Sequence, residues 1–231
     1  MRAILLAAGM GTRLRPLTLD TPKSLVKVLG EPMMERQIEF LKEKGIDEII
    51  VVTGYLNDKF NYLVDKYGVK LIHNKEYNKY NNIYTMYLVR EYLEDAYVID
   101  ADVYIKNNMF EANPEISKYY SAKKTGFSNE WIIIHDGKNR VVDIEVGTKE
   151  SAYILSGVSF WTKKSGEYIK RKLEEAVEER DFSNLYWDDI VRENLKELEI
   201  YIEKIGTNDI FEVDTLEDYN NLNELLISSN K

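Results

Sequence analysis

Basic side chains gather near the start of a chain that is acidic as a whole. Residues 10 to 30 contain four basic side chains and one acidic one, namely Arg13, Arg15, Lys23 and Lys27 against Asp20. This stretch therefore has a formal charge of +3 (four minus one), whereas the complete chain has −9. A guanidinium can hold two phosphate oxygens at once, and an ammonium is a compact point charge. The pattern indicates a local site for a phosphate-rich anion.

Small residues come directly before this basic stretch. Ala8, Gly9 and Gly11 follow the apolar run Arg2–Ala7, which is too short to cross a membrane and has the length of a buried parallel strand. Because these residues have almost no side chain, backbone N–H groups can approach a phosphate or the edge of a base closely. A strand, a glycine turn and then cations predict a loop that binds a polyphosphate.

Acidic residues end two other apolar segments. Asp100 and Asp102 close one segment, and Glu212 and Asp214 close another, just before an expected helix. Magnesium is commonly held by one or two carboxylates together with phosphate oxygens and water. Asp100 and Asp102 are therefore candidates to hold Mg²⁺ beside the glycine loop.

The first half of the chain alternates apolar runs of strand length with amphipathic stretches of helix length. We expect strands at Arg2–Ala7, Glu48–Thr53, Val69–His73 and Ala96–Asp100, and helices at Pro32–Lys44, Leu56–Tyr67 and Ile83–Leu93. Strands separated in this way pair in parallel through right-handed crossovers. The pattern predicts an α/β fold with a Rossmann-like, mixed but mainly parallel sheet flanked by helices. Ligands of such sheets bind at the carboxyl ends of the strands, where the glycine loop and Asp102 fall.

The second half has shorter strands and hairpin signals. We expect strands at Ser117–Lys124, Glu130–His135, Arg140–Val146, Tyr153–Trp161, Leu198–Glu203 and Ile210–Val213, and helices at Gly166–Glu179, Asn184–Lys196 and from Thr215, where Asp218 completes a capping box. No linker composition separates the halves. We therefore expect one domain over residues 1–231, with a nucleotide-binding half (1–115) and an acceptor-binding half (116–231) on the same sheet.

The string from Leu6 to Lys23, L-A-A-G-x-G-T-R-L-x-P-L-T-x-x-x-P-K, resembles the signature of the nucleoside-triphosphate transferases. This family includes the sugar-1-phosphate nucleotidyltransferases and related cytidylyltransferases. The resemblance implies that the nucleotide is bound by Leu6, Ala7, Ala8, Gly9, Gly11, Thr12, Arg13 and Lys23. It implies that Lys23 contacts the α-phosphate or the attacking phosphate and that Arg13 contacts the triphosphate. It further implies a catalytic Asp102, with Asp102 and Asp214 as the ligands of Mg²⁺.

Further phrases along the chain resemble one subgroup of this family, the bacterial CTP:phosphocholine cytidylyltransferases. In chain order they are YNN (80–82), IDAD (99–102), NEW (129–131), SGVSFW (156–161), YWD (186–188) and E-x-D (212–214). The resemblance implies transfer of CMP from CTP to phosphocholine, which gives CDP-choline and pyrophosphate. Asn81 and Asn82 are candidates to read the pyrimidine, because an amide offers both a donor and an acceptor. Asn82 is equally suited to cap the helix that follows it.

Aromatic and acidic side chains in the second half suit a quaternary ammonium group. Sugar-nucleotide enzymes of the family have Glu-Lys-Pro after a strand, but residues 145–149 of this chain read EVGTK. A quaternary ammonium has no hydrogen-bond donor and is recognised by aromatic faces, worth roughly 0.5–2 kcal/mol each, and by nearby carboxylates. We expect the acceptor to be bound by Trp131, Tyr186, Asp188 and Glu212. We expect Trp161 and Trp187 to pack in the core.

Composition narrows the remaining possibilities. The chain has no cysteine, which excludes disulfides and cysteine-based metal sites. It has no run of about twenty apolar residues and no signal-peptide pattern, so we expect a cytoplasmic protein without membrane insertion. A pI near 5.0 argues against nucleic acid as a partner. The expected partners are CTP and phosphocholine, and the oligomeric state stays open.

Two alternatives remain. The same chemistry could act on phosphoethanolamine, 2-aminoethylphosphonate or a sugar 1-phosphate, and a primary amine would depend more on carboxylates such as Asp188 and Glu212 than on aromatic rings. The chain could also be a non-catalytic nucleotide-binding regulator with the same fold. The joint presence of Arg13, Lys23 and the acidic segments disfavours the regulator.

Overall fold

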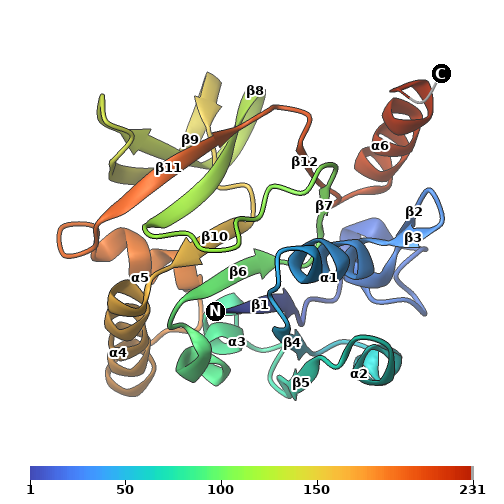
Figure 1. Cartoon of the computed structure of the whole chain (residues 1–231), viewed down its shortest axis with the longest axis horizontal. Coiled ribbons are helices and arrows are strands. Elements are labelled where there is room, and N and C mark those ends of the chain that lie inside the picture. The colour runs from blue at the N-terminus through green and yellow to red at the C-terminus, as the bar shows by residue number, and fades with distance from the viewer. Residues whose placement is uncertain (230–231) are drawn as a thin grey trace.

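A four-stranded parallel sheet lies at the centre of the computed structural model, which describes residues 1–229 (Figure 1). Its strands, in the order β5–β4–β1–β6, are β5 (Lys70–His73), β4 (Glu48–Thr53), β1 (Arg2–Ala7) and β6 (Ala96–Asp100). The interior residues of β4, β1 and β6 are nearly all buried, which explains why these strands read as continuous apolar runs, whereas β5 at the edge of the sheet is only partly buried.

The second half of the chain extends this same sheet beyond β6. Strand β10 (Val158–Trp161) lies antiparallel to β6, and β8 (Ser117–His135) lies antiparallel to β10. Strand β11 (Ile200–Ile205) then pairs with β8 in parallel, and β9 (Val141–Tyr153) forms a long hairpin with β8. The prediction of a mixed, mainly parallel sheet that carries both halves of the chain is confirmed.

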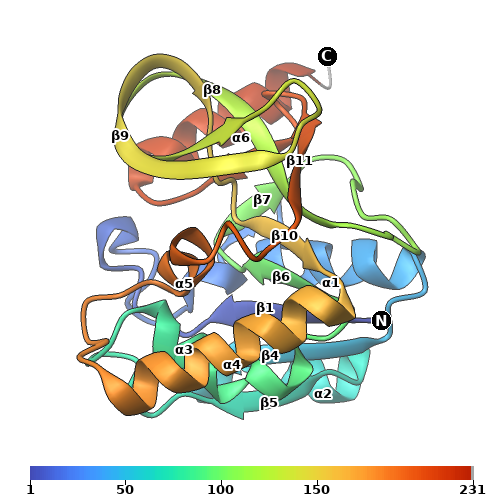
Figure 2. The ribbon, with the colours of Figure 1, turned by 90° about the vertical axis from the view of Figure 1, so that its left-hand side faces the viewer.

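Helices cover both faces of the sheet (Figures 1 and 2). Alternate residues of β1 point to opposite faces, so that Leu5 packs in one hydrophobic cluster and Ile4 in another. The first cluster includes residues of α1 (Met33–Glu43) and α2 (Tyr62–Tyr67). The second includes residues of α3 (Asn82–Leu88), α4 (Lys163–Glu179) and α5 (Trp187–Glu193). This second cluster also contains Trp161 and Trp187, as expected.

Short elements complete the fold. Strand β7 (Val103–Ile105) pairs antiparallel with β12 (Ile210–Glu212), and β12 leads into α6 (Leu216–Ser229). Strands β2 (Lys27–Val28) and β3 (Glu31–Pro32) form a small hairpin. The single-turn 3-10 helices are Thr12–Leu14, Lys23–Leu25, Asn57–Phe60 and Arg90–Tyr92. We did not expect β2, β3 or β7, because two or three residues are too few to show a periodic pattern.

The largest difference from the predicted elements lies in β8. Two strands were expected, Ser117–Lys124 and Glu130–His135, but the structure has one strand of 19 residues. Its register to β9 shifts between Phe127 and Glu130, and both Gly126 and Asn129 have left-handed backbone angles. A bulge of this kind bends a strand without ending it. The hairpin of β8 and β9 consequently curls into an arch (Figure 2).

Several expected helices are shorter than predicted. The stretch expected at Leu56–Tyr67 divides into a 3-10 turn and α2, and the one at Ile83–Leu93 becomes a 3-10 turn after Leu88. The helix expected from Asn184 begins only at Trp187, because Tyr186 is its N-cap and Asp189 accepts the Tyr186 N–H. The expected strand Tyr153–Trp161 is divided by an irregular stretch that contains Gly157, whose φ is +74°.

Candidate active site

The glycine loop follows β1 at the carboxyl end of the sheet. Gly11 adopts a φ of +58°, and a Cβ atom there would lie 2.9 Å from the Cβ atom of Lys23. The Thr18 hydroxyl donates a hydrogen bond of 2.7 Å to the Gly11 carbonyl and fixes the turn. The absence of a side chain at Gly11 therefore lets the loop pack directly against Lys23.

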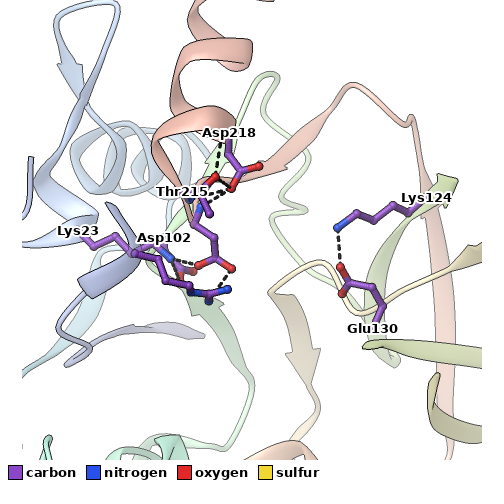
Figure 3. A network of polar contacts seen from close by, with 8 residues as sticks. Lys23, Asp102, Lys124, Glu130, Thr215 and Asp218 are labelled. Atoms are coloured by element: carbon purple, nitrogen blue, oxygen red, sulfur yellow. Dashed lines mark hydrogen bonds and ion pairs between the residues drawn. The ribbon is translucent and has the colours of Figure 1, made fainter. Parts of the chain in front are cut away.

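Lys23 lies at the centre of a network of charged side chains (Figure 3). Its Nζ donates a hydrogen bond of 2.7 Å to Asp102 Oδ2 and contacts a carboxylate oxygen of Asp214. Arg13 reaches Asp214 from the other side, with 2.8 Å between Nη2 and Oδ2. Lys23 is only 12% exposed, whereas Arg13 is 69% exposed. Three of the expected phosphate and metal residues are thus brought together around one lysine.

The charges in this network shift its pKa values in opposite directions. Burial alone would lower the pKa of Lys23, but the charges and hydrogen bonds of Asp102 and Asp214 prevail and raise it. Burial alone would raise the pKa of Asp214, but Lys23 and Arg13 prevail and lower it. Lys23 therefore stays positively charged and Asp214 negatively charged near neutral pH.

The pairing of β7 with β12 sets Asp102 beside Asp214. Asp102 precedes β7 and Asp214 follows β12, and the Val213 N–H donates a hydrogen bond of 3.2 Å to the Asp102 carbonyl. Thr215 caps α6 as expected: its Oγ1 accepts the Asp218 N–H at 3.1 Å, and the Asp218 carboxylate accepts the Thr215 N–H at 2.8 Å. The same carboxylate accepts the Asp214 N–H at 3.2 Å. The start of α6 therefore fixes the backbone of Asp214.

Asp100 and Glu212 join Asp102 and Asp214, and we call these four carboxylates the acidic wall. The pKa of Asp100 is raised well above its usual value by burial and by the charges of Asp102 and Asp188. Restricted hydration and the charges of Asp102 and Asp214 raise the pKa of Glu212 to about 7, although part of this side chain still meets solvent. Crowded carboxylates of this kind are stabilised by a bound cation.

The donor set fits a hard divalent cation. Asp102 and Asp214 both contact the ammonium group of Lys23, so their carboxylate oxygens lie close to one another. Within residues 1–229 no three histidine, aspartate or glutamate side chains are arranged as a complete metal site. Magnesium does not need one, because phosphate oxygens and water supply most of its ligands in nucleotide enzymes.

The expected aromatic side chains, Trp131 and Tyr186, contact each other. The rings of Trp131 and Tyr186 are 6.0 Å apart at 77°, an edge-to-face contact, and Tyr186 is 45% exposed. Asp188 follows two residues later and accepts a hydrogen bond of 3.0 Å from the Tyr119 hydroxyl. Burial raises the pKa of Asp188 to about 7. Asp188 and Asp100 both line one small cavity of about 20 Å³.

Asn81 and Asn82 bridge the two halves of the chain in the structure. Asn81 Nδ2 donates to the carbonyl of Asn184 at 2.9 Å, and Asn82 Oδ1 accepts the N–H of Trp187 at 3.0 Å. Asn82 is itself the first residue of α3 and caps the first turn of α5 rather than its own helix. Their role in reading a pyrimidine stays a prediction.

Two charged residues of the site were absent from the predicted set. Lys124 Nζ lies 2.6 Å from Glu130 Oε1, and both side chains extend from β8 toward the Lys23 network (Figure 3). Tyr119 was missed as well, since it reads as a core residue of an apolar strand. No sequence signal indicates the ion pair of Lys124 with Glu130, because these two residues fall on opposite sides of what looked like a turn.

A glycine loop at the carboxyl end of a parallel sheet, faced by a lysine between two aspartates, defines a transferase that acts on nucleoside triphosphates. Comparison with known proteins specifies the family. The family model described as "Nucleotidyl transferase" matches residues 2–224. The chain belongs to this nucleotidyl transferase family.

Individual relatives within the family are highly similar. Choline-phosphate cytidylyltransferase of Streptococcus pneumoniae is 48% identical over 230 residues, which covers 100% of both chains. The enzyme of the same name from Haemophilus influenzae is 42% identical over 96% of both chains. A solved structure of CTP:phosphocholine cytidylyltransferase from Streptococcus pneumoniae matches with a TM-score of 0.95 and covers 97% of this chain and 98% of that one.

Proposed function

We propose that this enzyme transfers CMP from CTP to phosphocholine, forming CDP-choline and releasing pyrophosphate. One observation supports this proposal above the others: the rings of Trp131 and Tyr186 are in edge-to-face contact, and Asp188, two residues after Tyr186, adds a carboxylate. Such a pair suits a group that is positively charged and has no hydrogen-bond donor. The full-length identity to choline-phosphate cytidylyltransferases supports the same acceptor.

The reaction is an in-line displacement at the α-phosphorus of CTP. An oxygen of the phosphocholine phosphate forms the new P–O bond, the bond to the bridging β-phosphate oxygen breaks, and its electron pair leaves with pyrophosphate. No covalent intermediate on the enzyme is needed. A phosphate monoester loses its second proton near pH 6, so the attacking oxygen is already ionised at neutral pH and needs no strong general base.

The residues of the site act by positioning and by charge. Lys23 neutralises the α-phosphate or the attacking phosphate, and Arg13, which is largely exposed, is free to turn toward the triphosphate. The backbone of Ala8, Gly9 and Gly11 approaches the phosphates and the base, with Leu6, Ala7 and Thr12 at the edges of this loop. We expect Asn81 and Asn82 to contact the cytosine.

Asp102 and Asp214 would hold Mg²⁺ together with the phosphates of CTP. When bound, the ion supplies additional positive charge as negative charge develops on the leaving pyrophosphate. Glu212 adjoins the same wall and would complete the acceptor side of the site. We regard residues 1–231 as one functional unit, because the acids come from both halves of the chain.

We expect the enzyme to act in the cytoplasm, without nucleic acid as a partner and without insertion into a membrane. Its substrates are small, charged and water-soluble molecules. Among the helices of residues 1–229, none has the length and apolar character needed to span a bilayer.

A matrix of four nucleoside triphosphates against several acceptors tests the proposal through pyrophosphate release with Mg²⁺. We expect CTP with phosphocholine to exceed every other combination by at least about tenfold, and CDP-choline to be the product. A clear preference for phosphoethanolamine, 2-aminoethylphosphonate or a sugar 1-phosphate would retain the chemistry and reject the acceptor. No pyrophosphate with any pair would favour a non-catalytic regulator.

A further inference from the structure

The phosphate of the acceptor has to approach a strongly acidic part of the molecule. The charge of Asp102 raises the pKa of both Asp100 and Glu212, and the carboxylates of Asp102 and Asp214 already pair with Lys23. Two negative charges on the incoming phosphate need a nearby cation on the acceptor side. Lys124 is placed there by the curl of β8.

The position of Lys124 depends on the bend of its strand. Lys124 and Glu130 are six residues apart and would be separated by about 20 Å in a straight strand. The register shift between Phe127 and Glu130, with left-handed angles at Gly126 and Asn129, curls the hairpin instead. Lys124 Nζ thereby comes within 2.6 Å of Glu130 Oε1. Phe127, Ile132 and Ile154 form a separate hydrophobic cluster that stabilises this curl.

The ammonium group of Lys124 is accessible to a ligand although it is paired with Glu130. Its side chain is 43% exposed, so a ligand can reach the ammonium. Partial burial opposes its charge, but Glu130, Glu212 and Asp218 together raise the pKa of Lys124. Trp131 follows Glu130 directly and contacts Tyr186. Figure 3 shows Lys124 extending from β8 toward the network around Lys23, with Glu130 as its partner.

We propose that Lys124 binds the phosphate of the acceptor, exchanging its contact with Glu130 for contacts with phosphate oxygens. This proposal rests on the proposed function, because it needs an acceptor that is a phosphate monoester. In the free enzyme, Glu130 holds the ammonium in place and satisfies its charge. In the complex, Lys124 fixes the phosphate while the aromatic pair holds the cationic end of the same molecule.

Substitution of Lys124 separates this role from a structural one. K124A should raise the KM for phosphocholine about 10- to 100-fold, which is the worth of one hydrogen bond to a charged group. The KM for CTP and kcat should each change less than about threefold, because Lys124 binds the acceptor equally before and during the reaction. K124R should recover part of the affinity. Calorimetry should show that K124A binds choline, which lacks a phosphate, as well as the wild type does.

Two other lysines of the same hairpin are matched controls. Lys123 is exposed and belongs to the same strand, so K123A removes an equal charge beside the site. Lys149 is exposed on β9, where it pairs with Glu145. Neither variant should change the KM for phosphocholine by more than about twofold.

Two results would overturn the assignment of Lys124. One is an unchanged KM for phosphocholine in K124A. The other is an equal rise of both KM values together with a lower unfolding midpoint, which would reveal a purely structural ion pair. Failure of the wild type to use phosphocholine is a different outcome, since it rejects the proposed function. The Lys124 variants would then be tested with the phosphate monoester that the wild type does use.

Discussion

Lys23 balances two carboxylates that belong to distant parts of the sequence. Its ammonium contacts Asp102 after β6 and Asp214 after β12, and only 12% of the side chain is exposed. We propose two functions for this lysine, to attract phosphate and to stabilise the acids that would hold Mg²⁺. Loss of its charge should affect both activity and folding.

K23A should lower kcat by about 10³-fold, because a preorganised positive charge at the reacting phosphate is lost. It should also lower the free energy of unfolding by about 1–3 kcal/mol at pH 8 without metal, since Asp102 and Asp214 lose their partner. The loss should shrink at pH 5, where crowded acids can protonate, and on addition of Mg²⁺, which would bind the folded state. Steady-state pyrophosphate release and urea unfolding measure these effects. A near-normal rate would remove Lys23 from the mechanism.

Asp188 makes the stability of the protein depend on pH. Its folded-state pKa, about 7, lies above the ordinary value of 3.8, so the folded protein binds this proton more tightly than the unfolded chain does. The contribution of Asp188 is most favourable below about pH 4 and is lost as the pH rises through 7. D188N keeps an oxygen that can accept the hydrogen bond from the Tyr119 hydroxyl, and it removes the negative charge of the side chain.

D188N should therefore be more stable than the wild type at pH 8, and the difference should be about 2 kcal/mol larger at pH 8 than at pH 5. Urea unfolding of both proteins at the two pH values measures the difference. The same variant should bind phosphocholine more weakly, because it lacks the carboxylate behind the aromatic pair. A difference in stability that does not change with pH would show that Asp188 is ionised at both values.

Strand β12 and the first turn of α6 determine where Asp214 lies. The pairing of β12 with β7 aligns its backbone, and the Asp218 carboxylate accepts the N–H groups of Asp214 and Thr215. Capping of this kind contributes about 1 kcal/mol to the stability of a helix. In this enzyme it also holds a residue of the site.

D218A should lower the free energy of unfolding by about 1–2 kcal/mol and reduce kcat several-fold. E217A is the matched control, since Glu217 is exposed in the same turn and has the same charge. Thermal unfolding and pyrophosphate release compare the two variants. Equal effects of D218A and E217A would mean that charge near α6, and not the cap, is responsible.

The buried parallel strands could be predicted to the residue. Strands β1, β4 and β6 have the predicted limits, because both of their faces are covered and their interior positions are apolar. The arch of β8 could not be predicted, because Gly126 and Asn129 are typical of a turn and here form a bulge. Strand β7 was missed because three residues show no period.

The candidate site, too, could be predicted only in part from the sequence. Motifs indicated Lys23, Asp102 and Asp214 separately, and the sheet topology explained why they meet. The contact of Trp131 with Tyr186 was expected from the chemistry of the acceptor. The pair of Lys124 with Glu130 depends on the curl of one strand, and no local pattern shows it.

The complete molecule brings polyanionic substrates to a protein with a net charge of −9. Lys23 pairs with Asp102 and Asp214, Lys124 of the β8–β9 hairpin pairs with Glu130, and helices cover both faces of the sheet (Figure 1). We therefore expect binding to depend on a few local cations and on a metal ion, and not on the field of the whole protein.

Calorimetric titration of CTP with and without Mg²⁺ tests this account most directly. We expect one CTP to bind per chain, at least about tenfold more tightly with Mg²⁺ than without, and this gain should be lost when Asp102 and Asp214 are replaced by asparagine. Folded wild-type protein that takes up no CTP in the presence of Mg²⁺ would contradict the account.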